Sequence, residues 1–389
     1  LPNISASGNI NRNQYNTTLN VGEPTETTKS NNFGNSYYEL TLTQTIFNAA
    51  SFAAFSEAKA TVRKATAELA AAEQSLIKRA AEKYFGLLLA EVNLELSIAE
   101  KTALQKQLEL AEARLAAGLA AITEVYEARA RYQLAEAVEI EKQNLLEDAR
   151  LSLTELTGED IKTVRGLKKN YPLVSPTPAD INNWTERALT QNFSVLTKKA
   201  ELDIAREKIS RMRAGHYPSL DLIGRQSTSE ADGRAIGSTL NPDSTTRIRR
   251  NTIGLQLNIP LVQGGLVMSQ TREAAKRFEV AQQLLEQTRR QVKRQTRLAY
   301  LNVSSSNRRI RALKQSVISN ESVVNAKQEG FKAGLNTNLI VLDAQSDLFL
   351  ARRDLVNAHY DYILNFFSLK EAAGNLVETD LEKITNWLE

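Results

Sequence analysis

The chain repeats itself at an offset of about 216 residues, and this internal duplication constrains the fold more than any other feature. Residues 217–222 (Tyr-Pro-Ser-Leu-Asp-Leu) echo residues 1–6, and the alternating segment 253–259 echoes residues 38–44. A glycine-centred turn also recurs, with Gly118 in the first copy and Gly334 in the second. Because stacked repeats can form one elongated body, 389 residues need not mean several unrelated domains.

The two glycine turns interrupt very long helical patterns. The flanking segments are rich in Ala, Glu, Leu, Lys and Arg and contain no proline, which favours helix. A helix C-terminus favours a residue that can take positive φ, and Gly118 and Gly334 stand at such places. We expect Thr123 and residues 336–338 to cap the helices that follow. The sequence therefore predicts two helical hairpins whose tips point the same way.

Apolar residues in these helices recur at coiled-coil spacing. Leu104, Leu108, Ala111 and Leu115 alternate steps of four and three. In the last long helix, four residues are spaced seven apart, namely Leu348, Leu355, Tyr362 and Leu369. Such spacing predicts helices packed side by side through narrow apolar seams.

Each repeat opens with a predicted β-hairpin. Asn, Ser, Thr and Gly dominate residues 1–20, a loop follows over 21–35, and residues 38–44 alternate apolar and polar. In the second copy a polar loop is expected over 226–250 before the strand at 253–259. Strands of about ten residues fit a membrane barrel in length. By themselves they fit a surface hairpin on a soluble domain better, since the barrel signal is weak per segment.

Composition narrows the class of protein. Charged residues make up 24% of the chain and mean hydropathy is −0.35, which excludes a bundle of membrane-spanning helices. The chain has no cysteine, so a disulfide scaffold and thiol chemistry are excluded. No signal peptide opens the sequence, so we expect a chain that is cytosolic, already processed or truncated. The net charge of +4 does not by itself indicate nucleic-acid binding.

The repeats define the expected domain organisation. The first repeat spans 1–157, with a β-hairpin over 1–47 and a helical hairpin over 48–157. A connector covers 158–180, and the second repeat spans 178–375. Within the second repeat we expect a leading helix over 178–215, a β-hairpin over 216–262 and a helical hairpin over 263–375. A terminal segment follows over 376–389. Since the first repeat begins at its strand, we expect its own leading helix to be missing, which would leave a gap in the helical wall.

Several motifs together resemble the TolC family of outer-membrane channel proteins, over essentially the whole chain. The resembling pieces are the strand opening 217–222, the strand ending 257–265 with its first-repeat counterpart 43–47, and the tips 117–125 and 333–335. The resemblance implies a mainly helical protein with some β-structure. It implies a homotrimer whose chains each give four strands to one twelve-stranded barrel, continued by an α-helical barrel.

The resemblance also implies a place and a function. The protein would be an exit duct for drugs or secreted proteins in the outer membrane of a Gram-negative bacterium, in contact with lipid and extending into the periplasm. A periplasmic adaptor would dock it to an inner-membrane RND, ABC or MFS transporter. The implied adaptor-contact tips are Ala117, Gly118, Leu119, Ala333, Gly334 and Leu335.

The same resemblance implies a gate near the tips. Glu124 matches the acidic latch position next to Thr123. Asn336 stands where a cationic residue occurs in the family and Phe331 where a tyrosine does, so we expect a weaker latch. Asp343 matches an inward carboxylate of the pore constriction, whereas Ile340 lacks the second one. Three copies of Asp343 would form a ring that favours cations, the only metal site that the sequence suggests.

No pattern of catalytic or cofactor-binding residues is found. The histidines, His216 and His359, have no ligand partners at metal spacing, and Thr123 and Thr337 are interpreted as helix caps rather than nucleophiles. The basic runs 289–294 and 308–311 are interpreted as a solvated helix face. The competing interpretation is a soluble coiled-coil scaffold or a nucleic-acid-binding protein. We therefore expect no enzyme, no cofactor and no nucleic-acid partner.

Overall fold

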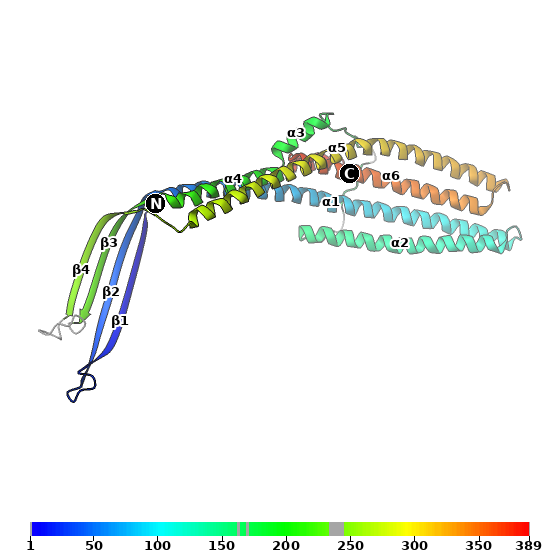
Figure 1. Ribbon diagram of the computed structural model, residues 1–389. Helices are drawn as coiled ribbons and strands as arrows, with labels where there is room; N and C mark the ends of the chain where they lie inside the picture. Colours follow the sequence, from blue (N-terminus) through cyan, green and yellow to red (C-terminus); the bar gives the residue numbers. More distant parts are fainter. Residues whose placement is uncertain (1, 162–163, 169–170, 233–244, 389) are drawn as a thin grey trace. The chain divides into compact units, whose positions relative to one another are not determined.

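The computed structural model describes residues 2–161, 164–168, 171–232 and 245–388. The chain divides into two compact units. Unit 1 contains Leu1–Val62 and Glu201–Gln282, and unit 2 contains Arg63–Ala200 and Gln283–Glu389. Each unit therefore takes one segment from each half of the chain (Figure 1).

Unit 1 is built around a four-stranded antiparallel sheet in the order β1-β2-β3-β4. The strands are β1 (Asn3–Leu19), β2 (Thr27–Asn48), β3 (Ser219–Asp232) and β4 (Thr245–Asn258). The central pairing of β2 with β3 joins the two repeats, with Thr43 opposite Ile223 and a bulge between Thr45 and Phe47. Along β4 nearly every residue is exposed, including Ile253, Leu255 and Leu257, so neither face of this strand is covered within one chain.

The strands extend into segments that the sequence predicted as loops. β2 begins at Thr27, inside the expected loop 21–35, and β3 and β4 occupy parts of the expected loop 226–250. In these extensions the side-chain contacts across the paired strands are polar, and the sequence does not alternate apolar and polar residues. The Thr18 and Thr28 hydroxyls lie 2.9 Å apart, and Asn13 Nδ2 donates to Asn35 Oδ1 over 3.2 Å. The middle of the second loop, residues 233–244, lies outside the described residues.

The main helices of unit 2 belong to two hairpins that lie side by side (Figure 1). They are α2 (Ile122–Thr157), α6 (Asn338–Ala373) and the parts of α1 (Ala49–Ala116) and α5 (Leu266–Lys332) that belong to unit 2. Their order across the layer is α2-α1-α6-α5. Ion pairs mark each neighbouring pair: Lys101 with Glu139 at 2.5 Å, Arg353 with Glu100 at 3.1 Å, and Arg352 with Glu321 at 2.8 Å. Near the tips α2 also contacts α6 directly, because Arg131 pairs with Asp343 there.

The largest apolar cluster of unit 2 lies away from the tips. Phe85 of α1 packs with Tyr360 and Phe367 of α6, and Trp184 contributes from α3 (Ile181–Gln191). The short helix α7 (Glu378–Thr385) adds Ile384. This cluster fixes α1 against α6 and leaves the tips to be held by smaller contacts.

The expected leading helix over 178–215 is wrong as a single element. The structure contains α3 and α4 (Phe193–Arg213), separated at Asn192, and a short 3-10 turn over Ala214–His216. Asn192 ends one helix and begins the next: its Oδ1 accepts from Ser194 N at 2.9 Å, and its Nδ2 donates to Ala372 O at 3.0 Å. The side chain therefore caps α4 and satisfies the end of α6, which a continuous helix could not do.

Candidate functional site

The tips of the two hairpins are tight turns of the same design. Gly118 and Gly334 have φ of 73° and 75°, as the turn pattern predicts. In each turn the following leucine bonds back to the helix it leaves: Leu119 N donates to Arg114 O and Leu335 N to Gly330 O, both at 2.8 Å. These bonds satisfy carbonyls at the helix ends.

The tips present apolar side chains to solvent. Leu119 is 68% exposed and Leu335 is 83% exposed, and all six predicted adaptor-contact residues belong to the exposed class. Both tips lie at the same end of unit 2 (Figure 1), because Leu342, near the start of α6, packs with Ala111 and Val125 near the tip of the first hairpin. Unit 2 therefore carries two neighbouring tips at one of its ends.

A cation–π contact joins the tips. The Arg114 guanidinium lies 4.7 Å from the centroid of the Phe331 ring, and its Nη2 donates to Leu119 O at 3.3 Å. Such a contact contributes about 0.5–1 kcal/mol at an exposed site. Phe331, predicted as a latch residue, thus contacts Arg114 of the first tip. Sequence reasoning missed Arg114, although it occupies the position equivalent to Gly330 in the second repeat.

Asn336 acts inside its own turn. Its Nδ2 donates to Lys327 O at 3.2 Å, and a Cβ placed on Gly330 would lie 2.1 Å from that nitrogen. The second tip therefore depends on a small residue at 330. Among the described residues, no hydrogen bond or ion pair joins the Glu124 carboxylate to Asn336 or Phe331 within one chain.

One of the two expected helix caps is wrong, because Thr123 lies inside α2, whose N-cap is Ala121. Thr337, within the expected range 336–338, is the N-cap of α6, although its side chain makes no capping hydrogen bond. Asn338 is only 2% exposed, and neither atom of its amide has a partner among the described residues. Glu124 lies in the first turn of α2, where a carboxylate is favourable for the helix dipole.

Asp343 is paired within its own chain. The Arg131 guanidinium on α2 donates to Asp343 Oδ1 on α6, and these side chains are 33% and 55% exposed. Ile340, one turn earlier, is 37% exposed. No local pattern could reveal the Arg131 partner, because the two residues are far apart in sequence. Any cation that binds at Asp343 must compete with this arginine.

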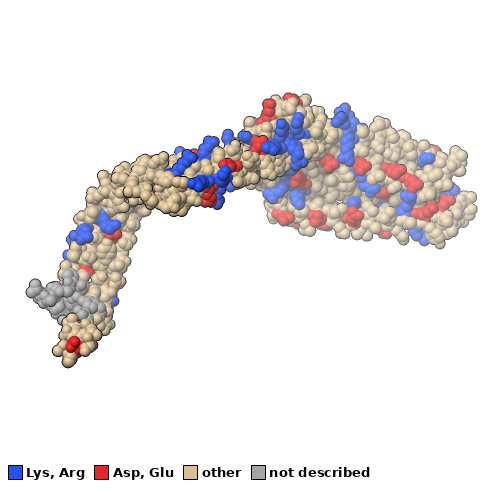
Figure 2. Space-filling view, viewed as in Figure 1, with Lys and Arg blue, Asp and Glu red and all other residues tan. Residues whose placement is uncertain are grey.

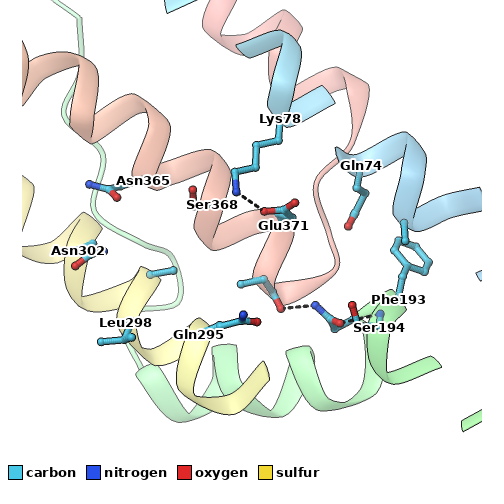
Figure 3. Close-up of a pocket in the computed structure, with 14 residues that line it drawn as sticks. Gln74, Lys78, Phe193, Ser194, Gln295, Leu298, Asn302, Asn365, Ser368 and Glu371 are labelled. Atoms are coloured by element: carbon cyan, nitrogen blue, oxygen red, sulfur yellow. Dashed lines mark hydrogen bonds and ion pairs between the residues drawn. The ribbon is translucent and has the colours of Figure 1, made fainter. Parts of the chain in front are cut away.

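A polar cavity of about 460 Å³ lies in unit 2 between α1, α4, α5 and α6 (Figure 3). Its charged groups are already paired, because Lys78 Nζ lies 2.7 Å from Glu371 Oε2. Gln74 Nε2 donates to Leu376 O at 2.9 Å, and on another side of the cavity Asn192 Nδ2 donates to Ala372 O. The cavity is therefore a hydrogen-bonded joint between helices, and we assign it no ligand.

Among the described residues, no helix is both long enough and apolar enough to cross a membrane. The same residues hold no cluster of three or more histidine, aspartate or glutamate side chains arranged for a metal ion.

Comparison with known proteins gives a consistent result. The family described as outer membrane efflux protein matches residues 1–159 and 184–375. Outer membrane protein TolC of Escherichia coli (strain K12) is 34% identical over 355 residues, which cover 90% of this chain and 71% of that protein. The alkaline protease secretion protein AprF of Pseudomonas aeruginosa is 30% identical over 347 residues, covering 89% and 71%.

The fold is also similar to solved structures. The crystal structure of the outer membrane protein VceC from Vibrio cholerae superposes with a TM-score of 0.75 at 20% identity. The superposition covers 95% of this chain and 87% of that one. Two strands followed by a long helical hairpin, an arrangement that occurs twice in the chain, thus form a fold shared with this outer membrane protein.

Proposed function

Because the chain belongs to the outer membrane efflux protein family, we propose that three copies assemble into one duct with a shared barrel of twelve strands. The protein is an outer-membrane exit duct for efflux and secretion that extends into the periplasm, and it is a transport protein rather than an enzyme. The observation that carries this conclusion is the family match across both repeats. The relatives give no support to a soluble scaffold or a nucleic-acid-binding protein.

The sheet supports assembly of several chains. β1 and β4 are edge strands, and an open strand edge cannot remain unpaired in lipid. Four strands are too few to close a barrel around an open lumen, so strands of several copies must join. Light scattering in detergent should give the mass of three chains plus the micelle. A stable monomer that keeps its full helix content would contradict the assembly.

We propose that the protein works with pump components at its exposed tips. An adaptor in the periplasm would contact Leu119 and Leu335, the most exposed apolar residues of the tips, and connect the duct to an inner-membrane RND, ABC or MFS transporter. Leu119→Asp with Leu335→Asp should abolish capture of the adaptor in a crosslinked pull-down. Leu69→Asp, at a residue of α1 that is 62% exposed and far from the tips, is the matched control.

The constriction is proposed at Asp343 and Ile340, with Glu124, Thr123, Phe331 and Asn336 forming the gate latch. Three Asp343 carboxylates around one axis would attract cations, and the Arg131 pair would weaken that attraction. In planar bilayers, Asp343→Asn should abolish block by a multivalent cation, whereas Arg131→Gln should strengthen the block. Equal block in the parent and in Asp343→Asn would place Asp343 on a solvated helix face.

The latch is expected to be weak, because Asn336 offers a neutral amide where a cation would make a stronger bond. Asn336→Arg should therefore lower the conductance of the closed channel relative to the parent. Unchanged conductance would mean that packing, such as the contact between Arg114 and Phe331, holds the closed state.

A further inference from the structure

The sheet of unit 1 has one apolar face. Residues paired across antiparallel strands point to the same side of a sheet, and successive residues of a strand point to opposite sides. The register therefore brings these apolar residues to one side, which is named the apolar face: Ile4, Leu40, Leu42, Leu222, Ile253 and Leu255. The other side carries Ser5, Ser7, Thr41, Ser227 and Thr252. On the side of the sheet seen in Figure 2, few side chains are charged.

The two ends of the sheet differ in what is attached to them. β2 continues into α1 at Ala49, and α4 leads into β3 through the 3-10 turn, so the helices of unit 1 leave from one end. The turn over 20–26 joins β1 to β2 at the other end. Because the protein extends from the outer membrane into the periplasm through its helices, the turn end faces away from the periplasm.

A groove of about 520 Å³ interrupts the apolar face. Ile4, Leu42, Gly224 and Ile253 form one row across the four strands, and the glycine leaves that row without a side chain on β3. A Cβ placed on Gly224 would lie 3.6 Å from Leu42 Cβ and 3.9 Å from Ile253 Cγ1. These two side chains thus form the walls of the groove, and Gly224 forms its floor. A hydrocarbon chain in such a groove gains van der Waals contact on several sides.

Toward the turn end the groove becomes polar. The next row places Gln226 opposite Asn251, and both residues line the groove. The row after that places Thr228 opposite Arg249, about 14 Å from the row of Gly224. Gln226, Asn251 and Arg249 all belong to the exposed class. The groove therefore leads from an apolar floor to two amides and a guanidinium.

Tyr38 relates this polar end to the depth of the membrane. It pairs with Thr228 and so lies in the row of Arg249, and it is 52% exposed. Its ring leans toward β1, because a Cβ placed on Gly8 would lie 3.0 Å from Tyr38 Cδ1. Tyrosine is enriched where the hydrocarbon of a membrane meets the headgroups. Arg249 thus lies at the level of lipid headgroups, and the Tyr38 ring leaves the space above Thr228 open.

The Arg249 guanidinium has no acidic partner in the ranges that the structure describes. Arg247, in the next row, pairs with Glu230 instead. The side chains of Gln226 and Asn251 likewise form no hydrogen bond with another described residue. A guanidinium binds phosphate through two parallel hydrogen bonds, and each amide supplies further donors. The three side chains are therefore suited to a phosphate group.

We propose that each chain binds one phosphate-bearing lipid of the outer leaflet on its apolar face. An acyl chain lies in the groove over Gly224, and the headgroup phosphate accepts hydrogen bonds from Arg249 and from the amides of Gln226 and Asn251. All of these groups belong to one chain, so the site is complete in every copy. The proposal rests on the outer-membrane location given under Proposed function.

Two lipids with the same acyl chains test the phosphate contact. Native mass spectrometry of the protein in detergent measures binding of dioleoyl phosphatidic acid and of dioleoylglycerol, which lacks the phosphate. The parent should bind phosphatidic acid more tightly, and Arg249→Gln should weaken that binding by at least about tenfold, the factor for one charge-assisted hydrogen bond. Arg250→Gln is the matched control, because Arg250 pairs with Ser227 and therefore points to the opposite face.

A second pair of variants tests the groove. Gly224→Leu should weaken binding of both lipids to a similar degree, because its side chain occupies the place of the acyl chain. Gly224→Ala, whose methyl group makes only ordinary contacts with Leu42 and Ile253, should have a smaller effect and secures the test if leucine disturbs the sheet. Gly254→Leu is the control, since Gly254 lies on the opposite face and a Cβ there would meet nothing within 4 Å.

The outcomes separate the lipid site from the assembly. Binding of phosphatidic acid that is unchanged in Arg249→Gln, or equally weakened in Arg250→Gln, would overturn the site. Displacement of the lipid by inorganic phosphate would make Arg249 a site for a soluble anion and would overturn it as well. If light scattering shows a trimer that binds neither lipid, the site is wrong and the assembly stands. A monomer that binds phosphatidic acid through Arg249 would contradict the assembly and support the site.

Discussion

Gly158 and Gly374 end the return helices of the two repeats with nearly the same backbone, at φ of 75° and 73°, but their surroundings differ. A Cβ on Gly158 would meet nothing within 4 Å, whereas a Cβ on Gly374 would lie 2.5 Å from Gln191 O. The tips also differ at equivalent positions. Gly330 of the second tip lies against the Asn336 side chain, whereas Arg114 of the first tip contacts the Phe331 ring of the second. Duplication has thus preserved backbone conformation while the contacts diverged.

The largest difference between the repeats is expected at these helix ends. Gly374→Ala adds left-handed strain and forces a methyl group into the backbone at Gln191. It should cost more than about 2 kcal/mol of the free energy of unfolding, whereas Gly158→Ala should cost only about 1 kcal/mol. Urea unfolding followed by helix circular dichroism measures both. Equal costs would show that the close approach at Gly374 relaxes freely.

The second prediction concerns Asn192, whose side chain bonds to the C-terminal end of α6. Asn192→Ala loses its bonds to Ala372 O and Ser194 N and should cost about 1–2 kcal/mol in the same measurement. Asn192→Asp keeps the acceptor for Ser194 N and loses the donor to Ala372 O. Its cost should therefore be intermediate, and a cost as large as that of alanine would assign the whole effect to the end of α6.

The third prediction concerns the contact between the tips. Arg114→Ala removes a contact of about 0.5–1 kcal/mol from Phe331. Hydrogen exchange should accelerate at both tips, although only the first is altered. Arg129→Ala breaks a surface pair with Glu112 and serves as the control, with no change expected around Phe331. Acceleration limited to the first tip would mean that the tips are not coupled.

The smallest effect is expected from pH. Burial, with a smaller contribution from Lys314, lowers the pKa of His359, whose Nδ1 lies 2.6 Å from the Tyr171 hydroxyl. As pH falls below about 6.5 the unfolded chain binds the proton first, so stability is full above that pH and declines through the lowered folded pKa. His359→Gln places the residue found at the equivalent position, Gln143, and should remove this slope from the unfolding midpoint. An unchanged slope would mean that other groups carry it.

Much of the fold could be predicted, because helical periodicity and glycine turns are local signals that occur twice. The contacts that distinguish the two copies could not. Arg131 pairs with Asp343, and Arg114 with Phe331, across more than two hundred residues, so no spacing rule reveals them. The break at Asn192 escaped prediction for the same reason, since the distant Ala372 accepts the bond that fixes it. Thr123 is not a cap because α2 begins at Ile122, two residues earlier than a cap at Thr123 would require.

The register of the sheet has a consequence for the order in which the chain folds. β1 and β2 pair across a turn of a few residues, whereas β2 and β3 join positions that are about 180 residues apart. Closing the longer loop costs about 3 kcal/mol more chain entropy. Contacts of such separation form late in folding. The two β-hairpins therefore form before they pair with each other. Until β2 pairs with β3, the edges of both strands are unpaired and exposed.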